Sequence, residues 1–309
     1  MVAVLVISLT VPAAACAGRP DDNAQPSAAP TASVTASPTP MASPTPMASP
    51  TPSPPQPTAP VAPEPAPAGP TTPAPAAPQP AAPAPAAPAQ PSSAAPAGLR
   101  GSDWTRIPTD ANVVALTFDA GGNAAGLPSI LATLQQTGTP ATFFLTGAWI
   151  RAFPDQARQV ASLGVPLGNH SDTHPHVPAL TNAQIAAELT AAEDSLRAIT
   201  GREFDPLFRF PFGDTTPLDI SVVNDQGYVC VRWTVDTLGW KGASGGMDAR
   251  QVVDRVTAAA TPGEIVLMHV GSHPTDGSTL DADALPTVIG ELRARGMQFV
   301  TLQALLQAT

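Results

Sequence analysis

The stretch NVVALTFDAGGNAAGLPSILATLQQTGTPATFFLT, residues 112–146, decides the fold class of this chain. It opens with an apolar run over 112–118 that predicts a buried strand. The segment 127–138 spaces its apolar residues as a helix does and ends on a glycine, and 141–146 is again a strand candidate. A strand, a helix and a second strand in this order predict a β-α-β unit with parallel strands.

The same alternation continues to the end of the chain. The clearest helix is 181–201, which begins at the N-cap candidate Thr181 and ends at Gly201. Further strands are expected at 207–210, 228–233, 264–270 and 298–302, and further helices after Asp248 and over 284–296. The strands are continuous apolar runs, which is typical of strands buried on both faces. We therefore expect an α/β fold, a closed or nearly closed (β/α) barrel, with its chemistry at the carboxyl ends of the strands.

Composition divides the chain into three parts. Residues 1–16 hold an apolar run and the sequence AAAC, which predict a secretion signal with a lipobox at Cys16; the alternative is an ordinary signal peptide cut near Ala15. Residues 17–98 are rich in Pro, Ala, Ser and Thr and predict a disordered tether, whereas 101–309 is long enough for one globular domain. The formal net charge of −10 argues against nucleic acid as a partner, because a binder of phosphate chains needs a basic face.

Five ionisable residues stand where apolar strands end: Asp119, His170, Arg209, Asp236 and His269. Any one of them alone is explained as well by a cap or by a satisfied core group. Because the carboxyl ends of parallel strands meet at one edge of a sheet, the five together predict a single active site there.

The segment GNHSDTHPH, residues 168–176, holds three of the five histidines of the chain. His170 and His174 can present both imidazoles to one side of a turn, and Pro175 disfavours a regular helix at His174. Neutral imidazole suits zinc and neighbouring divalent metals. We expect these two histidines to be metal ligands, with a third ligand from a carboxylate on another loop. His176 is interpreted as a residue of the rim.

Five segments in this order resemble the motifs of the polysaccharide deacetylases with a NodB homology domain, carbohydrate esterase family four. They are LTFDAGG (116–122), HSDTH (170–174), RFPFG (209–213), WTVDTLGW (233–240) and LMH (267–269). The resemblance covers nearly the whole globular part of the chain. It implies a distorted (β/α) barrel and the metal-dependent removal of N-acetyl groups from amino-sugar polymers.

The resemblance also implies a role for each matching residue. Asp119 matches the general base, and His170 and His174 match the two metal-binding histidines. Arg209 matches the arginine that braces the base, and His269 matches the general acid that protonates the departing amine. The implied cofactor is a divalent metal, zinc with cobalt or manganese as alternatives, whose charge makes water nucleophilic near neutral pH.

Two positions depart from the family pattern. Ala120 stands where the family has a metal-binding aspartate, and Gly239 stands where it has the aspartate that raises the pKa of the acid histidine. Three accounts of Ala120 stay open: Asp119 binds the metal itself, Asn123 or a water fills the gap, or the site is inactive and only holds glycan. Asp236 is expected to replace in part the missing partner of the acid histidine.

The segment HVGSHPTDGSTLDADAL, residues 269–285, places His273, Asp276, Asp281 and Asp283 just beyond a catalytic strand. It is either a loop that contacts substrate or supplies a relocated carboxylate ligand, or a polar loop with Asp281 near a helix start. Trp240 lies beside the expected site, where it either stacks on a sugar ring or packs in the core.

These observations predict an extracytoplasmic enzyme that is lipid-anchored at Cys16 to the outer face of the cell membrane or, as the alternative, secreted. An anchor followed by an extended tether suits an enzyme that works in a cell-wall layer. The expected partner is a cell-wall glycan, either peptidoglycan or a chitin-like polymer. Two alternative functions are a non-catalytic glycan-binding module, motivated by Ala120 and Gly239, and an O-acetyl esterase on a xylan-like glycan.

Overall fold

The computed structural model describes residues 95–308. The expected signal and lipobox segment 1–16, with Cys16, and the expected tether up to residue 94 lie outside the described residues. Among the helices of residues 95–308, none has the length and apolar character that a membrane crossing requires.

Nine strands within residues 95–308 form one curled sheet in which all pairings between strands are parallel. The strand order is β1-β6-β5-β4-β3-β2-β8-β7, and β9 pairs with β2. The strands are β1 (Asp103–Trp104), β2 (Val113–Ala120), β3 (Thr142–Leu145), β4 (Leu167–Asn169), β5 (Leu207–Phe208), β6 (Val229–Val231), β7 (Val235–Asp236), β8 (Glu264–His269) and β9 (Gln298–Val300). The expectation of an α/β fold with a distorted (β/α) barrel is confirmed, and the sheet path is open between β1 and β7.

Strand β2 is the centre of the sheet, and seven of its eight residues are buried. Its first residues pair with β9, its last residues pair with β3, and β8 runs beside it from Val114 to Asp119. The register sets Asp119 beside His269 on β8. The two strands therefore deliver a carboxylate and an imidazole to the same edge of the sheet.

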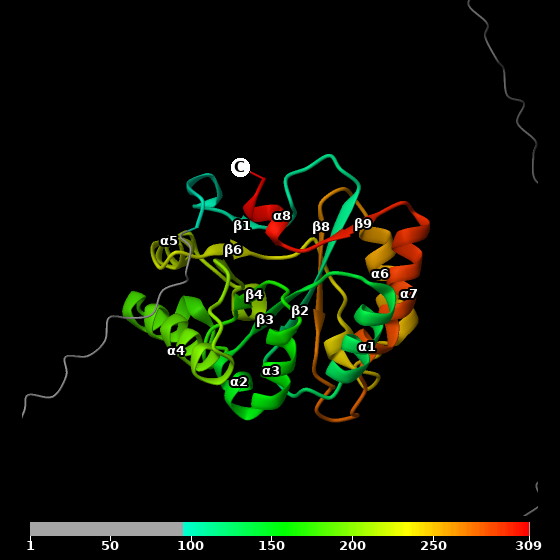
Figure 1. The fold of residues 1–309 in the computed structure, drawn as a ribbon, viewed down its shortest axis with the longest axis horizontal. Helices are drawn as coiled ribbons and strands as arrows, with labels where there is room; N and C mark the ends of the chain where they lie inside the picture. Colours follow the sequence, from blue (N-terminus) through cyan, green and yellow to red (C-terminus); the bar gives the residue numbers. More distant parts are fainter. Residues whose placement is uncertain (1–94, 309) are drawn as a thin grey trace, which may run out of the picture. The chain divides into compact units, whose positions relative to one another are not determined.

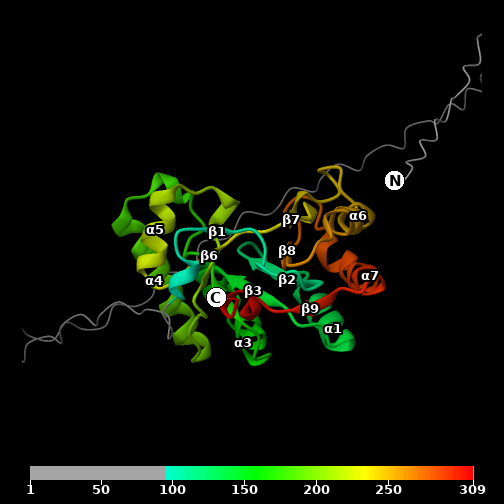
Figure 2. The same cartoon turned by 90° about the horizontal axis from the view of Figure 1, so that it is seen from above.

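Helices flank the sheet, as Figures 1 and 2 show, with α4 and α5 on one side and α1, α6 and α7 on the other. The helices are α1 (Leu127–Thr137), α2 (Gly147–Ala152), α3 (Pro154–Ser162), α4 (Asn182–Thr200), α5 (Pro217–Asp225), α6 (Ala249–Ala259), α7 (Leu280–Ala294) and α8 (Gln303–Leu306). Helix α4 begins at the expected N-cap Thr181, which forms a capping box with Gln184, and it ends at Gly201 in the left-handed region.

The two faces of β2 have different partners because its side chains alternate. Val114, Leu116 and Phe118 belong to the larger apolar core, which the helices cover. Ala115 faces the inside of the curl, where it joins a smaller apolar cluster that includes Phe144, Ile265 and, from the chain end, Leu302 and Leu305. Thr117 and Asp119 follow Ala115 on this inner face, so their polar groups lie next to the smaller apolar cluster, toward the carboxyl end of the strand.

Some boundaries differ from the expectations. Helix α7 begins at Leu280 rather than at 284, so Asp281 and Asp283 belong to its first turn. The expected strand over 228–233 is shorter, and Asp236 ends a separate strand, β7, which pairs with β8. Helices α2, α3 and α5 were not expected. For α5 a capping box formed by Thr216 and Asp219 was the local signal.

Candidate active site

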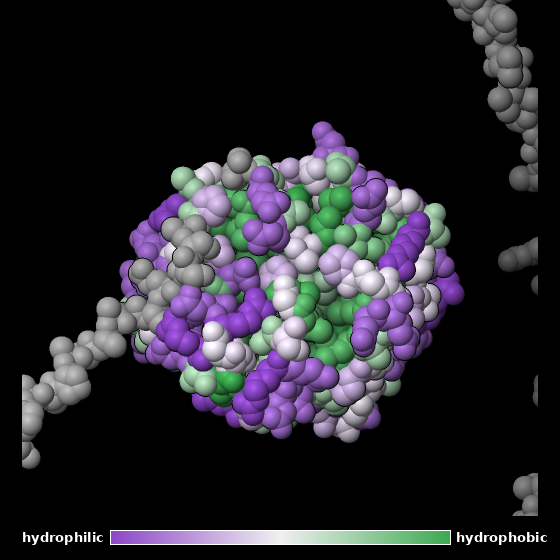
Figure 3. Space-filling view, viewed as in Figure 1, coloured by the Kyte–Doolittle hydropathy of each residue, from purple (hydrophilic) through white to green (hydrophobic). Residues whose placement is uncertain are grey.

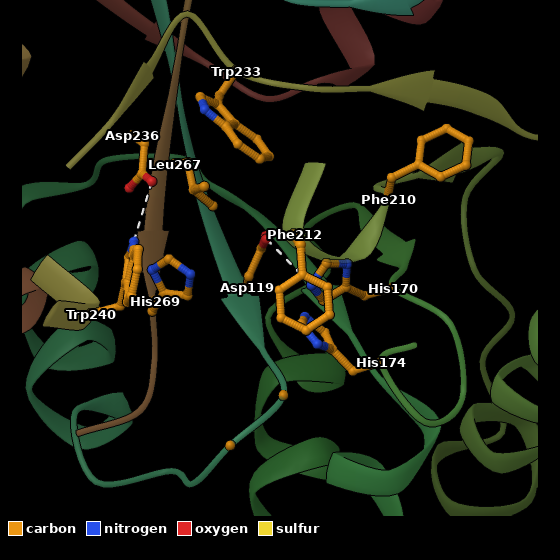
Figure 4. A pocket seen from close by; sticks show the side chains of 12 residues that line it. Asp119, His170, His174, Phe210, Phe212, Trp233, Asp236, Trp240, Leu267 and His269 are labelled. Atoms are coloured by element: carbon orange, nitrogen blue, oxygen red, sulfur yellow. Dashed lines mark hydrogen bonds and ion pairs between the residues drawn. The ribbon is translucent and has the colours of Figure 1, made fainter. Parts of the chain in front are cut away.

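A pocket of about 560 Å³ opens at the carboxyl ends of the strands, and its size is that of a site for a small molecule or a sugar unit. All five ionisable residues predicted at strand ends lie at this edge, and four of them line the pocket (Figure 4). The lining residues are Asp119, Gly121, Gly122, His170, His174, Phe210, Phe212, Trp233, Asp236, Trp240, Leu267 and His269. The molecular face drawn in Figure 3 mixes hydrophilic and apolar residues.

The carboxylate of Asp119 is buried and held by Arg209, whose Nη1 donates to Asp119 Oδ1 at 2.7 Å. Arg209 is fully buried, and three more of its donors reach the Thr117 hydroxyl and the carbonyls of Val231 and Arg232. Burial alone would raise the pKa of Asp119, but the guanidinium holds that pKa below its ordinary value. Asp119 is therefore an ionised carboxylate with one oxygen, Oδ2, left toward the pocket.

His170 is a buried, neutral imidazole whose tautomer follows from its neighbours. Its Nδ1 lies 2.9 Å from the carbonyl oxygen of Arg209, which can only accept, so Nδ1 carries the proton. Burial lowers the pKa of His170, which keeps the ring neutral. The lone pair of Nε2 then faces Asp119 Oδ2 at 3.5 Å.

His174 follows His170 in an irregular loop, as Pro175 led us to expect, with a positive φ of 60°. The two rings meet edge to face with their centroids 4.9 Å apart. The pKa of His174 is lowered to about 4, mainly because the ring is buried and in second place because His170 lies beside it. His176 lies on the rim, where it pairs with Asp214 at 2.7 Å and stacks on Phe212.

The donors at this edge suit a divalent cation. A neutral imidazole nitrogen and a carboxylate oxygen face each other without a proton between them, and a cation is the group that satisfies both. The carbonyl of Arg209 orients the His170 ring as second-sphere partners of metal-binding histidines do. Within residues 95–308, however, no three His, Cys, Asp or Glu side chains are arranged as a ready-made group of metal ligands.

Asn123 does not take the place of the metal-binding aspartate that the family has where this chain has Ala120. Ala120 is fully buried in the larger core. The side chain of Asn123 is engaged elsewhere, since it donates to the carbonyl of Ser272 and accepts from the backbone of Ser272 and Ala125. Asp119 Oδ2 is the carboxylate oxygen nearest to His170 that the described contacts provide.

His269 stands across the pocket from the histidine pair, at the end of β8 (Figure 4). Burial by itself would lower its pKa, but the adjacent carboxylate of Asp281 raises it above its ordinary value. Asp281 Oδ2 lies 3.4 Å from Nδ1 of His269 and accepts from its backbone N–H at 2.8 Å. Asp236, expected to replace this partner in part, makes a smaller contribution that also raises the pKa of His269, while its oxygens accept from the Leu238 backbone and the Trp240 indole.

Comparison with known proteins identifies the family of this chain. The family model for polysaccharide deacetylase matches residues 106–231. A peptidoglycan-N-acetylglucosamine deacetylase of Bacillus cereus is 32% identical over 203 residues, which are 65% of this chain and 71% of that protein. The chain belongs to the polysaccharide deacetylase family. A chitooligosaccharide deacetylase of Azorhizobium caulinodans is 29% identical to this family member over 199 residues, 62% of this chain and 93% of the relative.

Among solved structures, this chain resembles a wild-type CE4 family pseudoenzyme from Bacillus anthracis. The TM-score is 0.59 at 28% identity, over 65% of this chain and 68% of that one. The fold is thus shared by a solved peptidoglycan N-acetylglucosamine deacetylase, with a TM-score of 0.60 at 30% identity over 66% of this chain and 92% of that one, and by a relative described as a pseudoenzyme. For this chain, the side chains of its own pocket must therefore carry any argument about activity.

Sequence reasoning did not assign two features of the deacetylase pocket. One is Asp281, named only as a residue of a polar loop or a relocated ligand. The other is Phe212, which has a positive φ of 58° and whose ring lies 4.5 Å from that of His174. Trp240, which we expected beside the site, lines the pocket with 48% of its surface exposed.

Proposed function

We propose that this protein hydrolyses the N-acetyl groups of amino-sugar units in a cell-wall glycan, with N-acetylglucosamine or N-acetylmuramic acid of peptidoglycan as the substrate. The observation that carries the proposal is the pairing across one pocket of an ionised carboxylate, Asp119, with an imidazole of raised pKa, His269. An acid and a base with such opposed environments are what amide hydrolysis needs.

Asp119 acts as the general base in this proposal. Arg209 keeps the carboxylate ionised and fixes its orientation through the 2.7 Å hydrogen bond. Oδ2, the oxygen that the guanidinium leaves open, takes the proton of the attacking water; it would also face the cation, so that the duties of base and ligand fall on one carboxylate. The buried arginine is also held in place, because four of its five N–H donors are engaged.

His269 acts as the general acid. An amine is a poor leaving group unless its nitrogen is protonated as the bond to the acetyl carbon breaks. The raised pKa of His269 keeps its imidazole protonated nearer neutral pH, so that it has a proton to give. The apolar side chains of Leu267 and Trp240 line the pocket on the side of His269, Phe212 lines it on the side of His174, and together they suit the acetyl methyl group.

A divalent cation belongs to this proposal, and zinc, cobalt and manganese are the candidates. His170 and His174 would hold it together with Asp119 Oδ2, and the donor chemistry described above supports this set. When bound, such an ion polarises the acetyl carbonyl and lowers the pKa of a water. We also propose that the protein acts outside the cytoplasm, anchored through Cys16.

The test is acetate release. The full chain is incubated with N-acetylated peptidoglycan fragments and with chitooligosaccharides, with and without added zinc, cobalt or manganese. Release of acetate by the wild-type chain, and its loss in Asp119→Asn, is the expected result. If no amino-sugar polymer yields acetate with any of these metals, the proposed reaction is refuted.

A second candidate function is a non-catalytic module that binds wall glycan. Ala120, which removes an expected metal ligand, favours it, as does the similarity to a pseudoenzyme. A binding module retains glycan affinity in Asp119→Asn and His269→Ala while the wild-type chain releases nothing. An O-acetyl esterase would instead release acetate from acetylated xylan faster than from N-acetylated polymers.

A further inference from the structure

We propose that Asp281 is the positioning residue for His269, and that its carboxylate occupies the space that a side chain at position 239 would otherwise fill. This inference rests on the proposed function, in which His269 is the general acid. Asp281 lies in the first turn of α7 and has 4% of its surface exposed. A carboxylate buried this deeply is stable only with defined partners.

The partners of Asp281 all belong to the catalytic edge. Oδ2 accepts from the backbone N–H of His269 at 2.8 Å and lies 3.4 Å from its ring nitrogen Nδ1. Oδ1 accepts from the Thr237 hydroxyl at 2.6 Å. One carboxylate therefore holds the end of β8 by a hydrogen bond to its backbone and lies at ion-pair distance from the imidazole that this strand carries. Since Nδ1 faces Asp281, Nε2 on the far side of the ring is the nitrogen left for substrate.

The space between residue 239 and His269 admits only one side chain, and the Asp281 carboxylate fills it. A Cβ added at Gly239 would lie 2.6 Å from Cγ of Asp281, and its three nearest neighbours are all atoms of that carboxylate. The backbone does not itself require glycine here, because Gly239 lacks the positive φ that would. The family pattern brings a carboxylate from position 239, whereas this chain brings it from 281. We infer that the carboxylate that serves His269 comes from position 281 in this chain instead of from position 239.

The neighbouring carboxylates do not compete for this role. Both oxygens of Asp236 are engaged by Leu238 and Trp240. Asp283 lies in the same helical turn as Asp281, but it is exposed and accepts a hydrogen bond from the Thr279 hydroxyl. It shares with Asp281 its charge and its place near the helix N-terminus, so Asp283→Asn is a matched control.

The experiment measures acetate release and thermal unfolding of the full chain for the wild type, the control Asp283→Asn and four further variants. They are Asp281→Asn, Asp281→Ala, Gly239→Asp and the double variant Gly239→Asp/Asp281→Ala. Asp281→Asn keeps the shape of the side chain, and we expect it to lower kcat about 10- to 100-fold with KM within about threefold. Gly239→Asp alone is expected to lower both Tm and kcat, because two carboxylates compete for one space.

The double variant is decisive, because it returns a carboxylate to His269 from the other position. We expect it to turn over at least about tenfold faster than Asp281→Ala and to melt above Gly239→Asp, a non-additive result. Wild-type turnover in Asp281→Asn, a double variant no faster than Asp281→Ala, or an equal loss in Asp283→Asn would each overturn the inference. Failure of the proposed function looks different, since the wild-type chain would then release no acetate.

Discussion

Glu264, at the start of β8, is a buried acid that the proposed chemistry does not use. Its side chain is fully buried at the end of the strand opposite to His269, and neither carboxylate oxygen has a hydrogen-bond partner among the described residues. Burial raises the pKa of Glu264 to about 7, and Arg295 only partly offsets this. The group should therefore make the stability of the fold depend on pH.

The magnitude follows from the difference between the pKa of about 7 in the fold and the reference value of 4.5. At 1.36 kcal/mol for each unit, this difference is worth about 3 kcal/mol. As pH rises from 4.5, the unfolded chain loses this proton first, so the folded state holds more protons and its stability falls. The fall continues up to pH 7 and levels off above it.

Glu264→Gln removes the charge and keeps the shape of the protonated side chain. The variant should match the wild type near pH 4 and exceed its free energy of unfolding by about 3 kcal/mol at pH 8. For a domain of this size, that gain corresponds to a rise in Tm of roughly 5 to 10 °C. Melting curves followed by circular dichroism from pH 4 to 8 measure it.

The control is Glu291→Gln, which removes an exposed carboxylate from α7. It should change the free energy of unfolding by less than about 0.5 kcal/mol at every pH. A Glu264→Gln chain whose Tm differs from the wild type by the same amount at pH 5 and pH 8 would refute the reasoning. So would a variant that is less stable than the wild type at pH 8.

Three further predictions concern the pocket. Arg209→Met leaves the Asp119 carboxylate buried without its partner and should cost about 3 to 5 kcal/mol in denaturant unfolding; a smaller loss than 1 kcal/mol contradicts this. Trp240→Ala should raise KM for chitooligosaccharides about tenfold with kcat nearly unchanged, as steady-state kinetics will show, whereas a fall in kcat alone would argue against sugar stacking. Chelation should remove the activity, and added zinc should restore it. The His174→Ala variant should lose this response to zinc, whereas His176→Ala should keep it. Equal behaviour of the two variants would count against the proposed ligands.

Local pattern was enough to predict most of the architecture. The buried strand over 112–118 and the helix beginning at Thr181 appear close to their expected bounds, as β2 and α4, because periodicity and capping depend on neighbours in the chain. The predicted meeting of Asp119 and His269 was equally secure. Parallel strands bring their carboxyl ends to one edge whatever the details of the loops.

The missed elements are those in which packing outweighs local signals. Helices α2 and α3 are separated only by Phe153, with Pro154 at the start of α3, and the segment has no glycine stop to mark the break. Helix α7 contains Pro286 in its interior, so its sequence suggested a later start than Leu280. The contacts of α7 with α1 and α6 support the helix beyond its own preferences.

The sequence by itself determined the order of most strands and of helices α1, α4, α6 and α7, together with the set of ionisable groups at the strand ends, because these follow from short-range patterns and from the rule that parallel strands end together. Only the tertiary structure decided which carboxylate serves His269. The 3-10 turn Gly239–Lys241 packs against α7, and this contact brings Asp281 to the place left open by the glycine. Such a contact joins residues far apart in the chain, and its geometry depends on how a whole helix is seated, which no local pattern encodes.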